Sequence, residues 1–176
     1  MKSQWKDDRI EVNGLDIHYH RTGGDKPPIV LSHGATDNGL CWQQVAEELE
    51  AAYDLIMYDA RGHGLTKITS EQSGDMVEDL AHFIRSLKLT QPRLMGHSMG
   101  AATTMTLAAQ YPDLTRCIVL EEPPLNALFS QTPEAERRAN SERWRQRMLE
   151  TKQRPRERII AQGREEYPDW AEVEWG

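Results

Sequence analysis

The chain has 176 residues, a formal net charge of −7 and a sequence pI of about 5.4. This acidic balance argues against a nucleic-acid binder, which usually presents a basic face. No segment approaches the roughly 18 consecutive apolar residues of a membrane helix, and residues 1–10 lack the apolar core of a signal peptide. We therefore expect a cytoplasmic protein that binds neither nucleic acid nor membranes.

Short strands and helices alternate through the first two thirds of the chain. Residues 9–12 and 15–20 are predicted strands joined by Asn13-Gly14, a strong signal for a two-residue hairpin turn. Apolar segments that are too short for helices predict buried parallel strands at 29–31, 53–58, 93–95 and 117–120. Predicted helices lie between them, at 42–49, at 75–87 and at 101–109. The pattern predicts an α/β domain with a mostly parallel sheet and helices on both faces.

The sequence also predicts one helix cap and the state of the two cysteines. Asp75 is the expected cap of the second helix, with Glu78 as its capping-box partner. Cys41 and Cys117 lie in apolar contexts, which predicts two buried free thiols.

From Pro123 the composition changes. Residues 133–167 are rich in Arg and Glu, and their sparse apolar residues predict one or two amphipathic helices. The main apolar anchors are Trp144, Met148, Leu149, Ile159 and Ile160. We expect a core domain at 1–124 and part of a helical cap or lid at 125–176.

The strongest chemical signal is the segment Gly96-His97-Ser98-Met99-Gly100, which directly follows a predicted strand and precedes a predicted helix. A serine at such a sharp strand-to-helix turn projects its hydroxyl from the carboxyl edge of the sheet, and only small residues can flank it. The positive end of the following helix also points toward a developing oxyanion. Ser98 is therefore the candidate nucleophile.

An acyl-transfer site also needs two backbone N–H donors for the oxyanion. Met99 follows the nucleophile and offers one donor, and Ala35, after the bend that Gly34 permits, offers the second. His33 in the same loop is interpreted as a structural histidine that braces the loop. His63, in the segment Asp59-Ala60-Arg61-Gly62-His63-Gly64, is likewise expected to hydrogen-bond its loop rather than act as a base.

Taken in order, the motifs H-G-A, D-x-R-G-H-G and G-H-S-M-G resemble those of the α/β-hydrolase superfamily, over about residues 9–124. Within it they resemble the branch that includes esterases, lactonases and C–C bond hydrolases. The resemblance implies a serine hydrolase without cofactor or metal that cleaves a carboxylic ester or related small-molecule acyl substrate (EC 3.1) through an acyl-serine intermediate. Epoxide hydrolases and haloalkane dehalogenases have Asp at the nucleophile position, so Ser98 argues against those activities.

The sequence departs from the family in one respect. The family order is nucleophile, acid, histidine, but all six histidines of this chain precede Ser98. We therefore expect the chain to be the N-terminal part of a hydrolase, truncated within the cap, without the last strands and inactive alone. Glu122 is a possible acid, although a place at the cap hinge is the favoured interpretation.

Truncation would leave the strand at 117–120 as an open sheet edge. The expected partners are then the C-terminal remainder of the same protein as a separate chain, or a second copy of this chain. A hydrolase-fold binding module that has lost catalysis is the alternative function.

Overall fold

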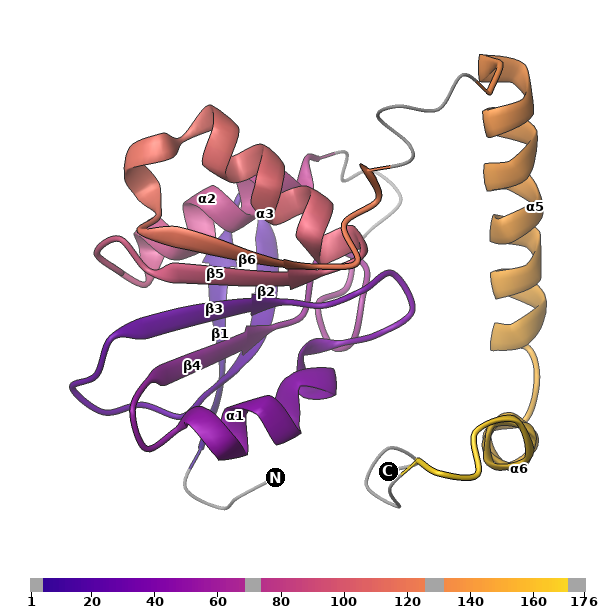
Figure 1. Ribbon diagram of the computed structural model, residues 1–176, viewed down its shortest axis with the longest axis horizontal. Helices are drawn as coiled ribbons and strands as arrows, with labels where there is room; N and C mark the ends of the chain where they lie inside the picture. Colours follow the sequence, from indigo (N-terminus) through magenta and orange to yellow (C-terminus); the bar gives the residue numbers. More distant parts are fainter. Residues whose placement is uncertain (1–4, 69–73, 126–131, 171–176) are drawn as a thin grey trace. The chain divides into compact units, whose positions relative to one another are not determined.

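The computed structural model describes residues 5–68, 74–125 and 132–170. The chain forms two compact units, Met1–Leu125 and Asn126–Gly176. The first unit contains a six-stranded sheet in the order β1-β2-β4-β3-β5-β6 (Figure 1).

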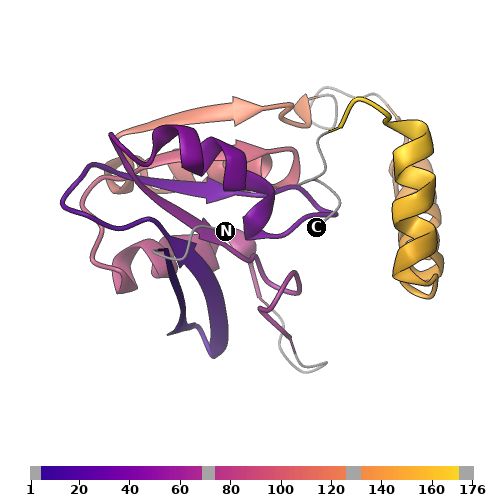
Figure 2. The ribbon, with the colours of Figure 1, turned by 90° about the horizontal axis from the view of Figure 1, so that it is seen from below.

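An antiparallel hairpin opens the first unit. Strands β1 (Lys6–Val12) and β2 (Leu15–Arg21) are joined by Asn13 and Gly14, whose φ angles are 52° and 74°. Both angles are positive, as a tight two-residue hairpin turn requires, so the predicted hairpin is confirmed. The turn fixes the pairing, which places Asp7 opposite His20. Figure 2 shows this hairpin steeply rotated relative to the central strands, as expected from sheet twist.

Parallel strands form the centre of the sheet. Strand β3 pairs in parallel with β4 and β5, and β5 pairs in parallel with β6, whereas β2 joins β4 antiparallel. The predicted mostly parallel sheet is thus confirmed. The bounds of these four strands are β3 Pro28–Ser32, β4 Asp54–Tyr58, β5 Arg93–His97 and β6 Cys117–Glu121.

Strand β6 differs from the expectation of a buried strand. Within the described sheet it pairs with β5 alone, and none of its residues is fully buried. Val119 is 53% exposed, whereas every residue of β4 is buried. The expectation of buried cysteines is also wrong, because Cys117 lies on this edge strand and Cys41 lies in a surface turn, both exposed.

Helices cover both faces of the sheet (Figures 1 and 2). On one face α2 (Met76–Ser86) and α3 (Met99–Gln110) pack on a core that includes Leu80, Phe83 and Leu107. On the other face a 3-10 turn, Gly39–Trp42, leads into α1 (Gln43–Leu49), and Trp42 and Ala46 pack there with Trp5, Leu31, Leu55 and Met57. A second 3-10 turn, Pro112–Leu114, follows α3.

The predicted cap of α2 is present. The Asp75 carboxylate accepts a hydrogen bond from the Val77 N–H at 2.7 Å. Glu78, the expected capping-box partner, instead accepts a hydrogen bond from the Tyr111 hydroxyl. That contact ties the start of α2 to the end of α3.

Within its described residues, 132–170, the second unit contains two helices, α5 (Glu134–Lys152) and α6 (Arg156–Glu166). Over their described lengths neither helix buries a residue, and Trp144, Leu149 and Ile159 are all exposed. The assignment of this unit as a lid remains a prediction. Across the described parts of both units, no helix is long and apolar enough to cross a membrane.

Candidate functional site

Ser98 lies between β5 and α3 with φ 49° and ψ −108°. Non-glycine residues rarely adopt such a backbone conformation, and holding one there costs about 1–3 kcal/mol. The Ser98 N–H donates to the Glu121 carbonyl at 3.0 Å, which anchors the turn to the end of β6. Surrounding structure therefore maintains a strained turn at the residue that the sequence predicted as nucleophile.

The two glycines of the motif are required by close backbone approach. A Cβ on Gly96 would lie 2.4 Å from the Gly100 carbonyl oxygen. A Cβ on Gly100 would lie 2.2 Å from the Ser32 carbonyl oxygen and 2.7 Å from that of His33. The start of α3 therefore packs directly against the end of β3 at Gly100 and against the end of β5 at Gly96, so each contact requires glycine.

The loop that contains Ala35 lies at the same sheet edge as Ser98. Strands β3 and β5 are parallel neighbours with Ser32 opposite Gly96, so the loops that follow the two strands begin at the same edge of the sheet. Gly34 is buried, and a Cβ there would lie 2.8 Å from His97 Nδ1. This placement agrees with the two predicted oxyanion donors, Ala35 and Met99, and their N–H roles stay a prediction.

Asp59, the residue directly after β4, holds three segments together. Its carboxylate accepts hydrogen bonds from the Gly39 and Leu65 N–H groups, each at 2.7 Å, and contacts His18 Nδ1 at 2.8 Å. A Cβ on Gly64 would lie 2.2 Å from this carboxylate. The first residue of the D-x-R-G-H-G motif is thus a buried carboxylate that connects the hairpin to the loops at the carboxyl edge of the sheet.

Arg61 of the same motif pairs with Asp79 on α2. The guanidinium makes two hydrogen bonds to the carboxylate, at 2.7 and 2.9 Å, and the two side chains are 9% and 4% exposed. Such a bidentate, desolvated pair holds the loop in a fixed position on α2.

Two histidines brace the loops, as predicted. His33 is buried; its Nε2 accepts from the Ala60 N–H at 3.0 Å, and its Nδ1 lies 2.7 Å from the Gly34 carbonyl. Burial, the largest effect, lowers the pKa of His33 and favours the neutral ring. His63 hydrogen-bonds the Ala35 carbonyl through Nε2 at 3.0 Å, which joins the two loops.

His97 and Glu122 are close to one another near the candidate nucleophile. His97 Nε2 lies 3.6 Å from a Glu122 carboxylate oxygen, and Nδ1 lies 3.8 Å from Asp37. The Glu122 side chain is 82% exposed, and the residue has a φ of 45°. The Glu122 side chain therefore lies at the surface beside His97, and its role as the acid stays a prediction.

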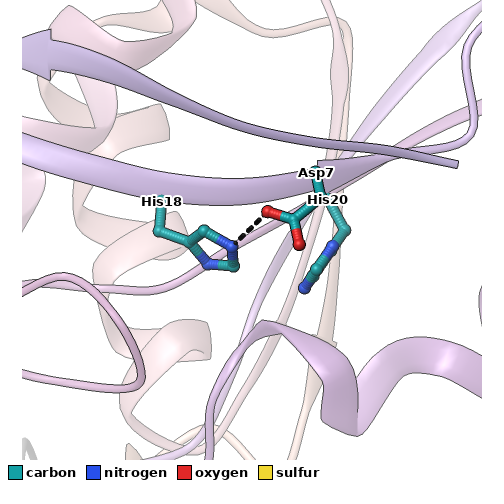
Figure 3. Close-up of side chains that lie close together, drawn as sticks. All are labelled: Asp7, His18 and His20. Atoms are coloured by element: carbon teal, nitrogen blue, oxygen red, sulfur yellow. Dashed lines mark hydrogen bonds and ion pairs between the residues drawn. The ribbon is translucent and has the colours of Figure 1, made fainter.

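A third group of side chains was not predicted from the sequence. Asp7, His18 and His20 come together on one face of the hairpin (Figure 3), with their potential ligand atoms within 4.8 Å of one another. The signal was present, since His18 and His20 are two residues apart on one strand and the two-residue turn places Asp7 opposite His20.

Comparisons with known proteins agree with this architecture. The family described as the alpha/beta hydrolase fold matches residues 27–164. A curated relative, 2-(acetamidomethylene)succinate hydrolase of Mesorhizobium japonicum, is 34% identical over 113 residues, which are 63% of this chain and 40% of that protein. N-formylmaleamate deformylase of Pseudomonas putida is 35% identical over 121 residues, 66% of this chain and 45% of that protein.

Solved structures give the same result. The N-formylmaleamic acid deformylase of Pseudomonas putida S16 superposes with a TM-score of 0.61 at 27% identity, covering 68% of this chain and 47% of that one. The epoxide hydrolase VrEH1 of Vigna radiata superposes with a TM-score of 0.64 at 25% identity, covering 68% of this chain and 39% of that one.

The chain belongs to the α/β-hydrolase family, and it has the fold of that family. It spans 40% and 45% of the lengths of the two curated relatives. These relatives are named as a hydrolase and a deformylase, which supports the expected hydrolase class but not a particular substrate.

Proposed function

We propose that the protein is a serine hydrolase that cleaves a carboxylic ester or related acyl substrate through an acyl-serine intermediate on Ser98. The observation that carries this proposal is the strained backbone of Ser98 at the strand-to-helix turn, flanked by two glycines that no other residue could replace without a backbone shift. A protein maintains such strain where it serves a function.

In the proposed reaction, Ser98 Oγ attacks the substrate carbonyl while a general base removes the hydroxyl proton. The oxyanion accepts hydrogen bonds from the Ala35 and Met99 N–H groups, and the positive end of α3 adds to its stabilisation. The alcohol or amine leaves with a proton from the protonated base. Water then attacks the acyl-serine and releases the acid. This chemistry uses no cofactor or metal.

The base is the missing component. No histidine follows Ser98 in the sequence, and His18 and His33 use both ring nitrogens in contacts with protein oxygen or nitrogen atoms. Loss of one triad member costs several orders of magnitude in rate. We therefore propose that the catalytic histidine comes from polypeptide outside these 176 residues. The acid comes from there as well, unless Glu122 fills that role. The chain alone is then inactive.

The substrate class can be narrowed by chemistry. Ser98 favours acyl transfer over epoxide opening, for which the family resemblance implies an Asp nucleophile. The two curated relatives are named for cleavage of an acetamido compound and of an N-formyl compound. The ester proposal therefore extends to a small acyl group on nitrogen, because esters and amides pass through tetrahedral intermediates of the same type.

A fluorophosphonate probe tests the nucleophile on the chain as it exists. We expect slow labelling of Ser98 that added imidazole accelerates, because imidazole can stand in for the missing base. Ser98→Ala should abolish the adduct, and Ser86→Ala, at an exposed serine on α2, should leave labelling unchanged. The proposal fails if no adduct forms on Ser98 with or without imidazole.

The second candidate is a hydrolase-fold binding module without catalysis. The absence of any histidine after Ser98 favours it. The intact glycines and the strained serine oppose it, because a site without catalytic function would not need to retain them. A well-folded chain whose Ser98 stays unlabelled in imidazole would support the binding module.

A further inference from the structure

We propose that Asp7, His18 and His20 form a binding site for a divalent transition-metal ion, with Zn²⁺ as the best match. This site lies on the β1–β2 hairpin (Figure 3) and is separate from the acyl-transfer chemistry proposed for Ser98. It does not depend on that function.

The hairpin holds the three donors in place. Asp7 and His20 are directly opposite each other in the antiparallel pair, and His18 is two residues from His20 on the same face. The donor atoms all lie within 4.8 Å of one another. Tetrahedral Zn²⁺ needs donors about 3.3 Å apart, so the donor atoms would need to approach one another by about 1.5 Å at most.

His18 already has the outer partner that a metal-binding histidine usually has. Its Nδ1 lies 2.8 Å from the buried carboxylate of Asp59, which two backbone N–H groups hold in place. A carboxylate at one ring nitrogen fixes the ring orientation and leaves the other nitrogen for the metal. That other nitrogen, Nε2, lies 2.8 Å from Asp7.

The ring of His18 therefore lies between two carboxylates. A neutral imidazole carries one proton and can donate to only one of them. A cation between His18 Nε2 and the Asp7 carboxylate would satisfy both groups at once.

His20 provides an independent observation. The residue is 4% exposed, and its Nδ1 is buried without a hydrogen-bond partner. Buried polar atoms almost always have a partner, and a ring nitrogen is a preferred ligand of Zn²⁺. A metal ion in this site would account for a buried histidine that otherwise costs free energy.

Chemistry and exposure indicate the kind of ion. Two imidazoles and one carboxylate suit Zn²⁺ and its first-row neighbours, whereas Mg²⁺ and Ca²⁺ prefer oxygen ligands. The Asp7 side chain is 55% exposed, so it can rotate and water can reach a fourth position. The expected effect is to fasten β1 to β2 and, through Asp59, to the loops at the carboxyl edge.

Titration of the untagged, metal-free chain with Co²⁺ and Zn²⁺ tests the proposal. We expect one Co²⁺ per chain with the visible absorption of a four-coordinate N/O site, displaced by Zn²⁺. Asp7→Asn and His20→Gln should each weaken binding by more than about tenfold, a loss that even outer-sphere partners can cause. Saturating Zn²⁺ should raise the Tm of the parent by several degrees and that of Asp7→Asn much less.

His82→Gln is the matched control, because His82 is an exposed histidine near a carboxylate on α2. It should bind both metals as the parent does. Asp7→Asn keeps the test decisive if His20→Gln fails to fold, since Asp7 is a surface residue. The absence of saturable binding, or equal binding by the parent and both ligand variants, would overturn the proposal.

Discussion

Replacement of Gly100 by Ala is the sharpest test of the turn geometry, because two known effects oppose each other there. Gly100 lies in the first turn of α3, where Ala is intrinsically favoured over Gly by about 1 kcal/mol. The new Cβ, however, would lie 2.2 Å from the Ser32 oxygen and 2.7 Å from the His33 oxygen. Both are backbone atoms that cannot move without displacing the end of β3. Overpacking of this kind costs about 1–3 kcal/mol or more.

We therefore expect Gly100→Ala to lower the free energy of unfolding by about 2 kcal/mol or more, measured by urea denaturation followed by circular dichroism. Ala109→Gly, at an exposed position on the same helix, calibrates helix propensity and should cost about 1 kcal/mol or less. If Gly100→Ala is as stable as the parent or more stable, α3 does not pack on β3 as described and the reasoning is refuted.

Asp79→Asn removes the carboxylate charge that pairs with the buried Arg61 and should cost about 3–5 kcal/mol in urea denaturation. Arg138→Gln, in an exposed pair on α5, should change stability by less than about 0.5 kcal/mol. Because burial lowers the pKa of His33 below 6.5, the unfolded chain takes up this proton first as the pH falls. The contribution of His33 to stability should then be constant above about pH 6.5 and decrease below it. His33→Gln should make the loss of stability below that pH less steep, and an unchanged slope would contradict the assignment. Val119→Lys, on the exposed edge strand β6, should reduce self-association in size-exclusion chromatography, and a parent that is strictly monomeric would remove the basis for this prediction.

Short-range patterns predicted most of the first unit. The Asn13-Gly14 turn, the Asp75 cap and the alternation of apolar strands with helices each depend on neighbours within a few residues. Each predicted strand was found, and differences were confined to the ends. The turn around Ser98 was predictable for the same reason, because its glycines and its position between a strand and a helix are local features.

Features that depend on distant residues were missed. Cys117 is exposed because β6 is the edge strand of the described sheet, and Cys41 is exposed because it lies in a surface turn. Neither position can be predicted from the apolar residues next to each cysteine in the sequence. No role was predicted for Asp59 from the sequence, whereas its carboxylate contacts residues 18, 39 and 65. These contacts arise only when the order of strands in the sheet is known.

The Asp7–His18–His20 group is an intermediate case. The hairpin turn was predicted, and its pairing register alone brings Asp7 opposite His20. What the sequence could not provide was the burial of His20 and the placement of Asp59 behind His18. Both come from strand β4 packing beside β2.

The most direct test of the central claim is the site of acylation after prolonged exposure of the chain to p-nitrophenyl acetate. A chain without the histidine should be acylated slowly and should also deacylate slowly, so an acetyl group should accumulate. Peptide mass mapping should place it on the segment containing Ser98, and Ser98→Ala should lose it. Acetylation found only on lysines, and unchanged in Ser98→Ala, would contradict the assignment of Ser98 as the nucleophile.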